Sequence, residues 1–172
     1  MKIAVAEEIG VISLATKDVV ILDSKGNQRT AKTGDNFNQN DTIITPKGGK
    51  TQLLFKDQMT INLSQGSELK VDEFVFSNDN QQDNKLTTSI KKGAFKFISG
   101  KISDQNPEAM KVKTPKTQIA IRGTSVIGDI KEDSENIVLL DGIIEVAPID
   151  NPAVSQIINQ SGFAVVVDVA SG

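Results

Sequence analysis

The 172-residue sequence contains no cysteine, no histidine, no tryptophan and no tyrosine. The absence of cysteine excludes disulfides and thiolate chemistry. The absence of histidine removes the commonest general base and metal ligand, so histidine-activated nucleophiles and the usual zinc and haem sites are excluded. Without tryptophan and tyrosine, the usual stacking platforms for sugars and bases are also missing. We therefore predict a protein that is not an enzyme and that holds no metal and no cofactor.

Long hydrophobic runs are missing as well. No stretch approaches the roughly 18 apolar residues of a membrane span, so we expect no membrane-spanning segment in this sequence. The triplet Ala4-Val5-Ala6 has the small-x-small form of a signal-peptidase site, but the segment before it is too short for the apolar part of a signal peptide. A remnant of a cleavage site and a chance match both stay open. We assign residues 1–7 to an N-terminal tail and residues 8–172 to a single domain.

β-branched residues are abundant, with 35 Ile and Val against 9 Leu, and this excess favours strands. Apolar residues also alternate with polar ones, as in Phe95-Lys96-Phe97, which is typical of a strand with one buried face. We predict that Phe95 and Phe97 lie in the core. The expected fold is an all-β, twisted β-solenoid-like or β-sandwich-like module with little or no helix. One helical turn is possible at residues 106–110, because Pro107 suits a first helical position.

Turn residues recur about every 8 to 12 positions, as all-β domains require. The predicted turns are residues 24–27, 34–35, 46–49, Gly66, Gly100, Gly128, 141–142 and 161–162. The segment from Ser77 to Asn84 is a polar loop without any apolar residue, and it is the best candidate for a mobile insertion. Whether Asp79 and Asp83 in this loop hold calcium stays open.

Several apparent site motifs fail on spacing. Gly49-Lys50-Thr51 looks like the end of a phosphate-binding loop, but the required earlier glycine is missing and a strand-like segment follows. The acidic groups at residues 7–8, 72–73 and 132–135 are interpreted as solvated charges, because adjacent strand residues point to opposite faces and cannot form a catalytic pair. The lysines between residues 91 and 116 lack exposed aromatic neighbours, so we predict no nucleic-acid partner.

Charge is unevenly distributed although the net charge is only −3. Residues 91–122 carry eight basic and two acidic residues, or +6, whereas residues 129–150 carry one basic and seven acidic residues, or −6. Two interpretations remain: solvated faces of neighbouring strands, or a polar interface that joins copies head to tail.

The segment 114–124, TPKTQIAIRGT, opens with Thr-Pro and closes with Arg-Gly-Thr. Proline fixes φ and removes a donor, so it precedes a strand, and a glycine after the strand permits a bulge or a positive φ. Arg122 is out of phase with the isoleucines and therefore faces solvent or crosses a neighbouring strand. A folding signature and a ligand-contact loop both stay open. The candidate motif residues are Thr114, Pro115, Ile119, Ile121, Arg122, Gly123 and Thr124.

Together with its surroundings, this segment resembles the FecR-like domain family of bacterial proteins. The resemblance also includes 41–45 (DTIIT), 52–61 (QLLFKDQMTI), 71–76 (VDEFVF) and 92–102 (KGAFKFISGKI), and it covers about residues 8–147. It implies an all-β, twisted, solenoid-like module outside the cytoplasm. The founding members are membrane-anchored anti-sigma proteins that relay signals from an outer-membrane receptor, and this sequence shows neither the span nor the sigma-binding helices of that layout.

We therefore predict a non-enzymatic, extracytoplasmic protein-interaction module that is periplasmic, surface-located or secreted, with an unidentified protein partner. The alternatives are a self-assembling structural subunit of a filament or surface layer, and a carbohydrate- or surface-binding module. A homo-oligomer is compatible with the first alternative, since open sheet edges are templates for association.

Overall fold

A computed structural model describes residues 7–106 and 108–168. The structure is 58% strand and 5% helix, and its fourteen described strands belong to one mixed sheet. The prediction of an all-β fold is confirmed. The Ala4-Val5-Ala6 triplet of the possible cleavage site and Pro107 of the predicted helical turn lie outside the described residues.

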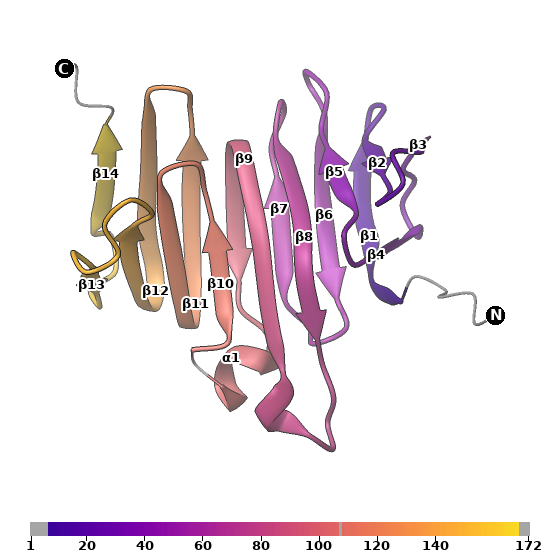
Figure 1. The fold of residues 1–172 in the computed structure, drawn as a ribbon. Coiled ribbons are helices and arrows are strands. Elements are labelled where there is room, and N and C mark those ends of the chain that lie inside the picture. The colour runs from indigo at the N-terminus through magenta and orange to yellow at the C-terminus, as the bar shows by residue number, and fades with distance from the viewer. Residues whose placement is uncertain (1–6, 107, 169–172) are drawn as a thin grey trace.

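The described strands are β1 (Glu8–Thr16), β2 (Val20–Leu22), β3 (Gln28–Thr30), β4 (Asn36–Asn38), β5 (Thr42–Ile44), β6 (Lys50–Phe55), β7 (Thr60–Leu63), β8 (Glu68–Val75), β9 (Lys85–Ile98), β10 (Met110–Lys113), β11 (Thr117–Ile130), β12 (Ser134–Pro148), β13 (Gln156–Ile158) and β14 (Ala164–Asp168). From β5 onward the strands follow the chain in order along the stack, whereas β4 lies outside β1 and β3 lies outside β2 at the N-terminal end (Figure 1). The helical elements are a 3-10 turn, η1 (Gln81–Asp83), and a short helix, α1 (Lys101–Gln105).

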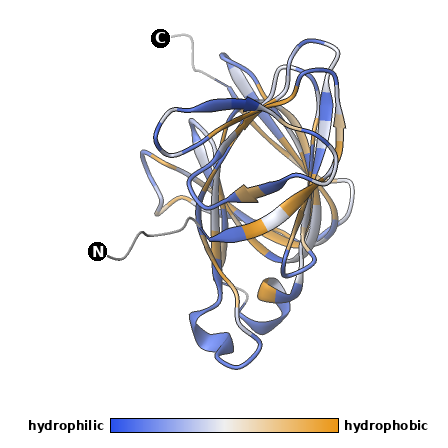
Figure 2. Cartoon of the chain, turned by 90° about the vertical axis from the view of Figure 1, so that its right-hand side faces the viewer, coloured by the Kyte–Doolittle hydropathy of each residue, from blue (hydrophilic) through white to orange (hydrophobic). Residues whose placement is uncertain are grey.

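Strand pairings divide the sheet into two walls. One wall has the order β4-β1-β6-β7-β9-β11-β12-β14, and the other has the order β3-β2-β5-β8-β9-β10-β11-β12-β13. The long strands β9, β11 and β12 take part in both walls, and only the β9–β10 pairing is parallel among those described. Seen along the stack from the β3 side, the strands surround one interior (Figure 2).

Each long strand passes from one wall to the other at a glycine with positive φ: Gly93 (98°), Gly123 (54°) and Gly142 (91°). In β11 the buried positions are odd-numbered up to Ile121 and even-numbered from Thr124 onward. An extra residue at this point reverses the alternation, so both halves of the strand keep their apolar side chains inside. The glycines thus bend the long strands around a common core.

The core is built from the inward positions of both walls. Phe95 and Phe97 are 3% and 0% exposed and pair with Leu63 and Ile61 of β7, so the prediction that they are core residues is confirmed. Burial of such side chains is the main source of stability in a fold of this kind.

Two predicted turns are wrong. Gly128 lies inside β11, and the pair at residues 141–142 lies inside β12. Gly128 is required by packing, since a Cβ there would overlap the ring of Phe95. Gly142 forms part of the wall-to-wall bend instead of a chain reversal.

The helical turn also lies elsewhere than predicted. It covers Lys101–Gln105, whereas the sequence suggested residues 106–110. Its start is fixed by buried Asp57, whose carboxylate accepts hydrogen bonds from the backbone N–H groups of Met59 and Ile102 at 3.1 and 3.4 Å. This tertiary contact between the β6–β7 turn and α1 is not visible in local sequence.

The polar loop 77–84 is tied at its base. The buried Asn84 side chain accepts a hydrogen bond from the Ser77 backbone N–H at 2.6 Å and donates to the Ser77 carbonyl at 2.8 Å and to Gln105 at 2.7 Å. The loop is therefore anchored to α1, although its tip residues are exposed.

Candidate functional site

The Thr-Pro part of the 114–124 segment forms the turn between β10 and β11. Thr114 is 6% exposed, and its hydroxyl lies 2.5 Å from the carboxylate of Glu135 on β12. Glu135 also accepts hydrogen bonds from the Thr117 hydroxyl at 3.0 Å and from the Lys116 backbone N–H at 2.9 Å. Pro115 lies in this turn, two residues before β11 begins.

Glu135 is fully buried, so its interpretation as a solvated charge is wrong. The signal was present in the sequence, because Glu135 alternates with Ile137 and Leu139 and therefore shares their inward face. A buried carboxylate is tolerated only when its oxygens are hydrogen-bonded, and here two hydroxyls and one amide satisfy them.

The Gly-Thr part forms the bend of β11 against β12. Gly142 lies so close to Gly123 that a Cβ on Gly142 would overlap the carbonyl oxygen of Gly123. The Thr124 hydroxyl accepts a hydrogen bond from the Ile143 N–H at 3.2 Å and lies 2.7 Å from the Ile143 carbonyl oxygen. Thr124 therefore satisfies backbone groups where the regular ladder is interrupted.

Between the Thr-Pro turn and the bend, residues of β11 alternate between the inner and the outer face of the wall. Ile119 and Ile121 are fully buried, whereas Arg122 is exposed on the outer face. Within the described part of the chain, Arg122 forms no ion pair. Of the two placements that the sequence left open for Arg122, the structure shows the solvent-facing one.

Arg122 borders a groove of about 460 Å³ on the outer face of β10, β11 and β12. Four of its lining residues are charged and the others are mostly small or apolar. The lining residues are Glu108, Lys111, Gln118, Ala120, Arg122, Ile143, Glu145, Ala147, Pro152 and Ile157.

The strand register explains why this surface is hollow. Ala120 pairs with Lys111 on one side and with Glu145 on the other, and Glu145 pairs with Ile157 of β13. A methyl group thus lies in the middle of a row of long side chains, which stand above it as walls. The result is a narrow apolar floor between charged edges, which suits an extended chain segment better than a compact ligand.

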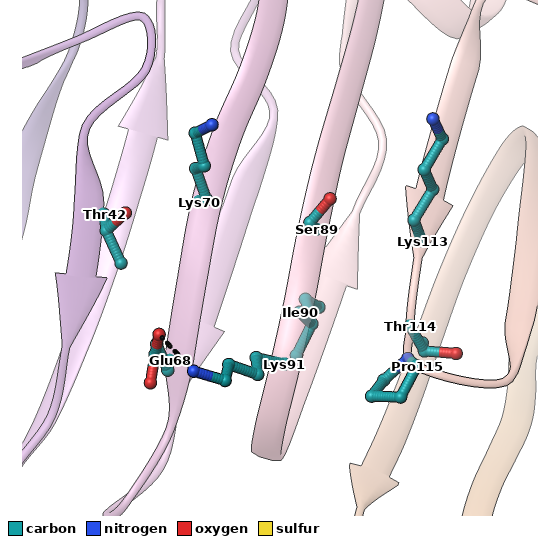
Figure 3. A pocket seen from close by; sticks show the side chains of 9 residues that line it. All are labelled: Thr42, Glu68, Lys70, Ser89, Ile90, Lys91, Lys113, Thr114 and Pro115. Carbon is teal, nitrogen blue, oxygen red and sulfur yellow. Dashed lines mark hydrogen bonds and ion pairs between the residues drawn. The ribbon is translucent and has the colours of Figure 1, made fainter. Parts of the chain in front are cut away.

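A second hollow of about 340 Å³ lies on the same wall, across β8, β9 and β10 (Figure 3). Lys70 and Lys113 stand on either side of Ser89 in this view, and the ion pair between Lys91 and Glu68, at 3.4 Å, occupies one end. Because both charges of that pair are already matched, this hollow offers less unpaired charge than the groove at Arg122.

The carboxyl groups with raised pKa values do not line these hollows. Burial raises the pKa of Asp41 and of Asp57, and both groups cap backbone N–H groups without lining either hollow. Among residues 7–106 and 108–168, no three acidic side chains are placed to hold a metal ion. In the same part of the chain, no helix is long and apolar enough to cross a bilayer.

Sequence reasoning missed the groove. Its residues come from β10, β11, β12, β13, the 149–155 connection and the segment before β10, and only the strand register brings them together. The one signal available was the phase of Arg122, which placed it outside the core.

Comparison with solved structures supports the fold. The crystal structure at 1.65 Å of a putative anti-sigma factor from Parabacteroides distasonis ATCC 8503 superposes with a TM-score of 0.58 at 15% sequence identity. A second crystal structure under the same description, at 2.50 Å, gives the same values. The match covers 76% of this chain and 56% of the other, so this chain corresponds to little more than half of that protein's length.

No curated protein matches the chain in sequence. The family model described as FecR protein matches residues 41–145, from the buried Asp41 through the 114–124 segment to the groove residue Glu145. This match spans more than half of the sequence and contains both the bend glycines and the Thr-Pro turn, so the chain belongs to the FecR family.

Proposed function

We propose that this chain is a non-enzymatic interaction module that works outside the cytoplasm, and that an extended segment of a partner protein binds the groove at Arg122. The observation that carries the proposal is the contrast within one segment. Six of the seven motif residues are engaged in the turn, the core or the bend, whereas Arg122 projects outward at the edge of a groove.

The chemistry of the groove defines the expected ligand. A small apolar side chain fits over Ala120, and an acidic residue beside it would meet Arg122 and Lys111. Arginine binds carboxylates in a planar, two-pronged geometry, which adds orientation to attraction. The partner segment is therefore expected to combine apolar residues with an acidic residue that faces Arg122 and Lys111 and a basic residue that faces Glu108 and Glu145.

Family membership supports a module that is not an enzyme and that acts extracytoplasmically. The absence of histidine and cysteine from the sequence agrees with it. The two carboxyl groups with raised pKa values cap backbone amides, which is a structural role.

The test is affinity capture from the envelope fraction of the source organism with the unmodified chain, R122E and K56E. Lys56 is exposed in the β6–β7 turn, away from the groove, so K56E makes the same charge change elsewhere. We expect one protein to be retained by the unmodified chain and by K56E and lost with R122E. Equal retention by all three would contradict the groove, and recovery of the native protein only in cytosol would contradict the location.

A further inference from the structure

Exposed large apolar side chains are concentrated at the C-terminal end of the stack. Of the eleven large hydrophobic residues that are exposed in the described chain, five fall between residues 149 and 166. They are Ile149 (48%), Val154 (57%), Ile157 (68%), Phe163 (59%) and Val166 (57%). Exposed apolar side chains gathered at one end of a protein are a feature of interaction sites.

The sheet edge at this end is free among the described residues. Both β13 and β14 pair with β12 and with no other described strand, and Figure 1 shows them at the outer edge of the stack. From Phe163 to Val167 the chain carries no charge and no proline. Proteins usually protect exposed edges with charged residues, proline or bulges, and in β14 the one such residue is Asp168 at the end of the strand.

The core is also open at this edge. Val165 pairs with Ile137, which is fully buried, so Val165 and Val167 share the inward face. Yet both remain partly exposed, whereas the inward residues of interior strands such as Ile137 and Leu139 are fully buried. A further strand next to β14 would complete their burial.

The opposite end of the stack differs in chemistry. β4 ends the wall that carries β14, and its two residues that are not buried, Asn36 and Asn38, are polar. β3 ends the other wall, where Gln28 to Thr30 are exposed and polar and Arg29 pairs with Asp35 at 3.1 Å. The oppositely charged stretches 91–122 and 129–150 also do not mark the two ends, since both include residues of β11. An apolar edge does not complement this polar edge, so head-to-tail stacking is disfavoured.

We propose that the edge strand β14 pairs with β14 of a second copy of this chain, antiparallel and about a two-fold axis. A two-fold axis perpendicular to the sheet keeps the inward faces of both copies on the same side. With the axis at Val166, Val165 lies opposite the partner's Val167 on the inward face, and Val166 lies opposite the partner's Val166 on the outer face. Asp168 then lies opposite the partner's Ala164, so no like charges oppose each other across the pair.

The second copy is the occupant that satisfies all of these conditions at once. It brings a strand edge whose one charge, Asp168, lies opposite an alanine, and it brings two half-buried valines to close the core. It also gives a closed assembly, as isologous contacts do. Backbone pairing and apolar burial hold such a dimer together, so it persists at high salt, unlike an assembly made by surface charges.

The first experiment measures mass by light scattering from micromolar to submillimolar concentration at low and high salt. We expect a dimer at both salt levels, and V166K should raise its dissociation constant by about tenfold or more, because it places two ammonium groups face to face. The matched control is I127K, since Ile127 is exposed on the outer face of β11 and lies away from the edge. Far-UV circular dichroism verifies that both variants fold.

The second experiment uses the absence of cysteine, which makes any introduced cysteine unique. V166C treated with a short bis-maleimide should give a covalent dimer, whereas L54C, at an exposed position on β6, should not. A protein that stays monomeric under all of these conditions overturns the proposal. It does so also if a peptide of another protein binds the β14 edge instead. A dimer that V166K leaves intact, or that cross-links at residue 54 and not at 166, also overturns it.

Discussion

Thr114 and Glu135 are linked by a buried hydrogen bond of 2.5 Å between a hydroxyl and a carboxylate, across 21 residues of sequence. Glu135 forms no ion pair with any described residue, so its carboxyl group is satisfied by hydrogen bonds alone. The contact fixes the Thr-Pro turn against β12 and thereby sets the position of the strand that carries Arg122.

Glu135→Ala is therefore expected to lower the free energy of unfolding by roughly 2–4 kcal/mol, because it leaves the Thr114 and Thr117 hydroxyls and the Lys116 N–H without their buried acceptor. Glu145→Ala is the matched control, since Glu145 is exposed on the same strand. Urea unfolding of the two variants measures the difference. Equal stabilities would mean that water replaces the carboxylate without cost.

Gly142→Ala should lower the free energy of unfolding by roughly 2–5 kcal/mol. About 1–2 kcal/mol reflects the left-handed backbone and about 1–3 kcal/mol reflects displacement of the Gly123 carbonyl. Gly26→Ala separates the two effects, because Gly26 has a similar φ of 88° but no atom within 4 Å of an added Cβ. The control should lose only the backbone part, and equal losses would show that the contact with Gly123 is unimportant.

Phe97→Ala should lower the free energy of unfolding by roughly 3–5 kcal/mol, since it empties a fully buried ring position. Its neighbour Ile98 is 40% exposed on the opposite face, so Ile98→Ala should cost less than about 1 kcal/mol. Thermal and urea unfolding report both. If the two variants lose the same stability, the assignment of faces in β9 is wrong.

The fold class and the core face of most strands could be predicted because alternation is a local signal. Phe95 and Phe97 show this directly, and so do Ile119 and Ile121. The alternation changes phase in β11 between Ile121 and Thr124 and in β12 around Gly142. The sequence predicts a turn at residues 141–142, where the structure has a bend within a strand. A bulge and a turn both need positive φ, so the residue type alone does not separate them.

The candidate site was harder to predict because it depends on register. Ala120 is an unremarkable residue in the sequence, and it becomes the floor of a groove only when Lys111 and Glu145 lie on either side of it. Likewise, the role of Asp57 depends on α1, which lies 45 residues away at its contact with Ile102. Contacts at this separation leave no trace in periodicity.

Asp57 predicts a pH dependence of stability. Burial raises the pKa of this carboxyl above its ordinary value of 3.8, although hydrogen bonds from the Met59 and Ile102 N–H groups act in the opposite direction. The folded protein therefore binds more protons than the unfolded chain between 3.8 and the raised pKa. Stability from this group is greatest below 3.8, falls as pH rises through that window, and is constant above it.

Asp57→Asn removes the titrating group and keeps one oxygen as the acceptor for the Met59 N–H. The Ile102 N–H loses its acceptor, and this loss of stability does not depend on pH. The free energy of unfolding of the unmodified protein minus that of D57N should therefore decrease as the pH rises above 3.8, and it should level off above the raised pKa. Other carboxyl groups titrate in both proteins, so their contributions cancel in the difference. One of them is Asp23, whose pKa is lowered by its hydrogen bonds with Asn27. Urea unfolding across this range measures it. A difference that increases with pH would show that the hydrogen bonds outweigh burial and that the folded-state pKa of Asp57 lies below 3.8.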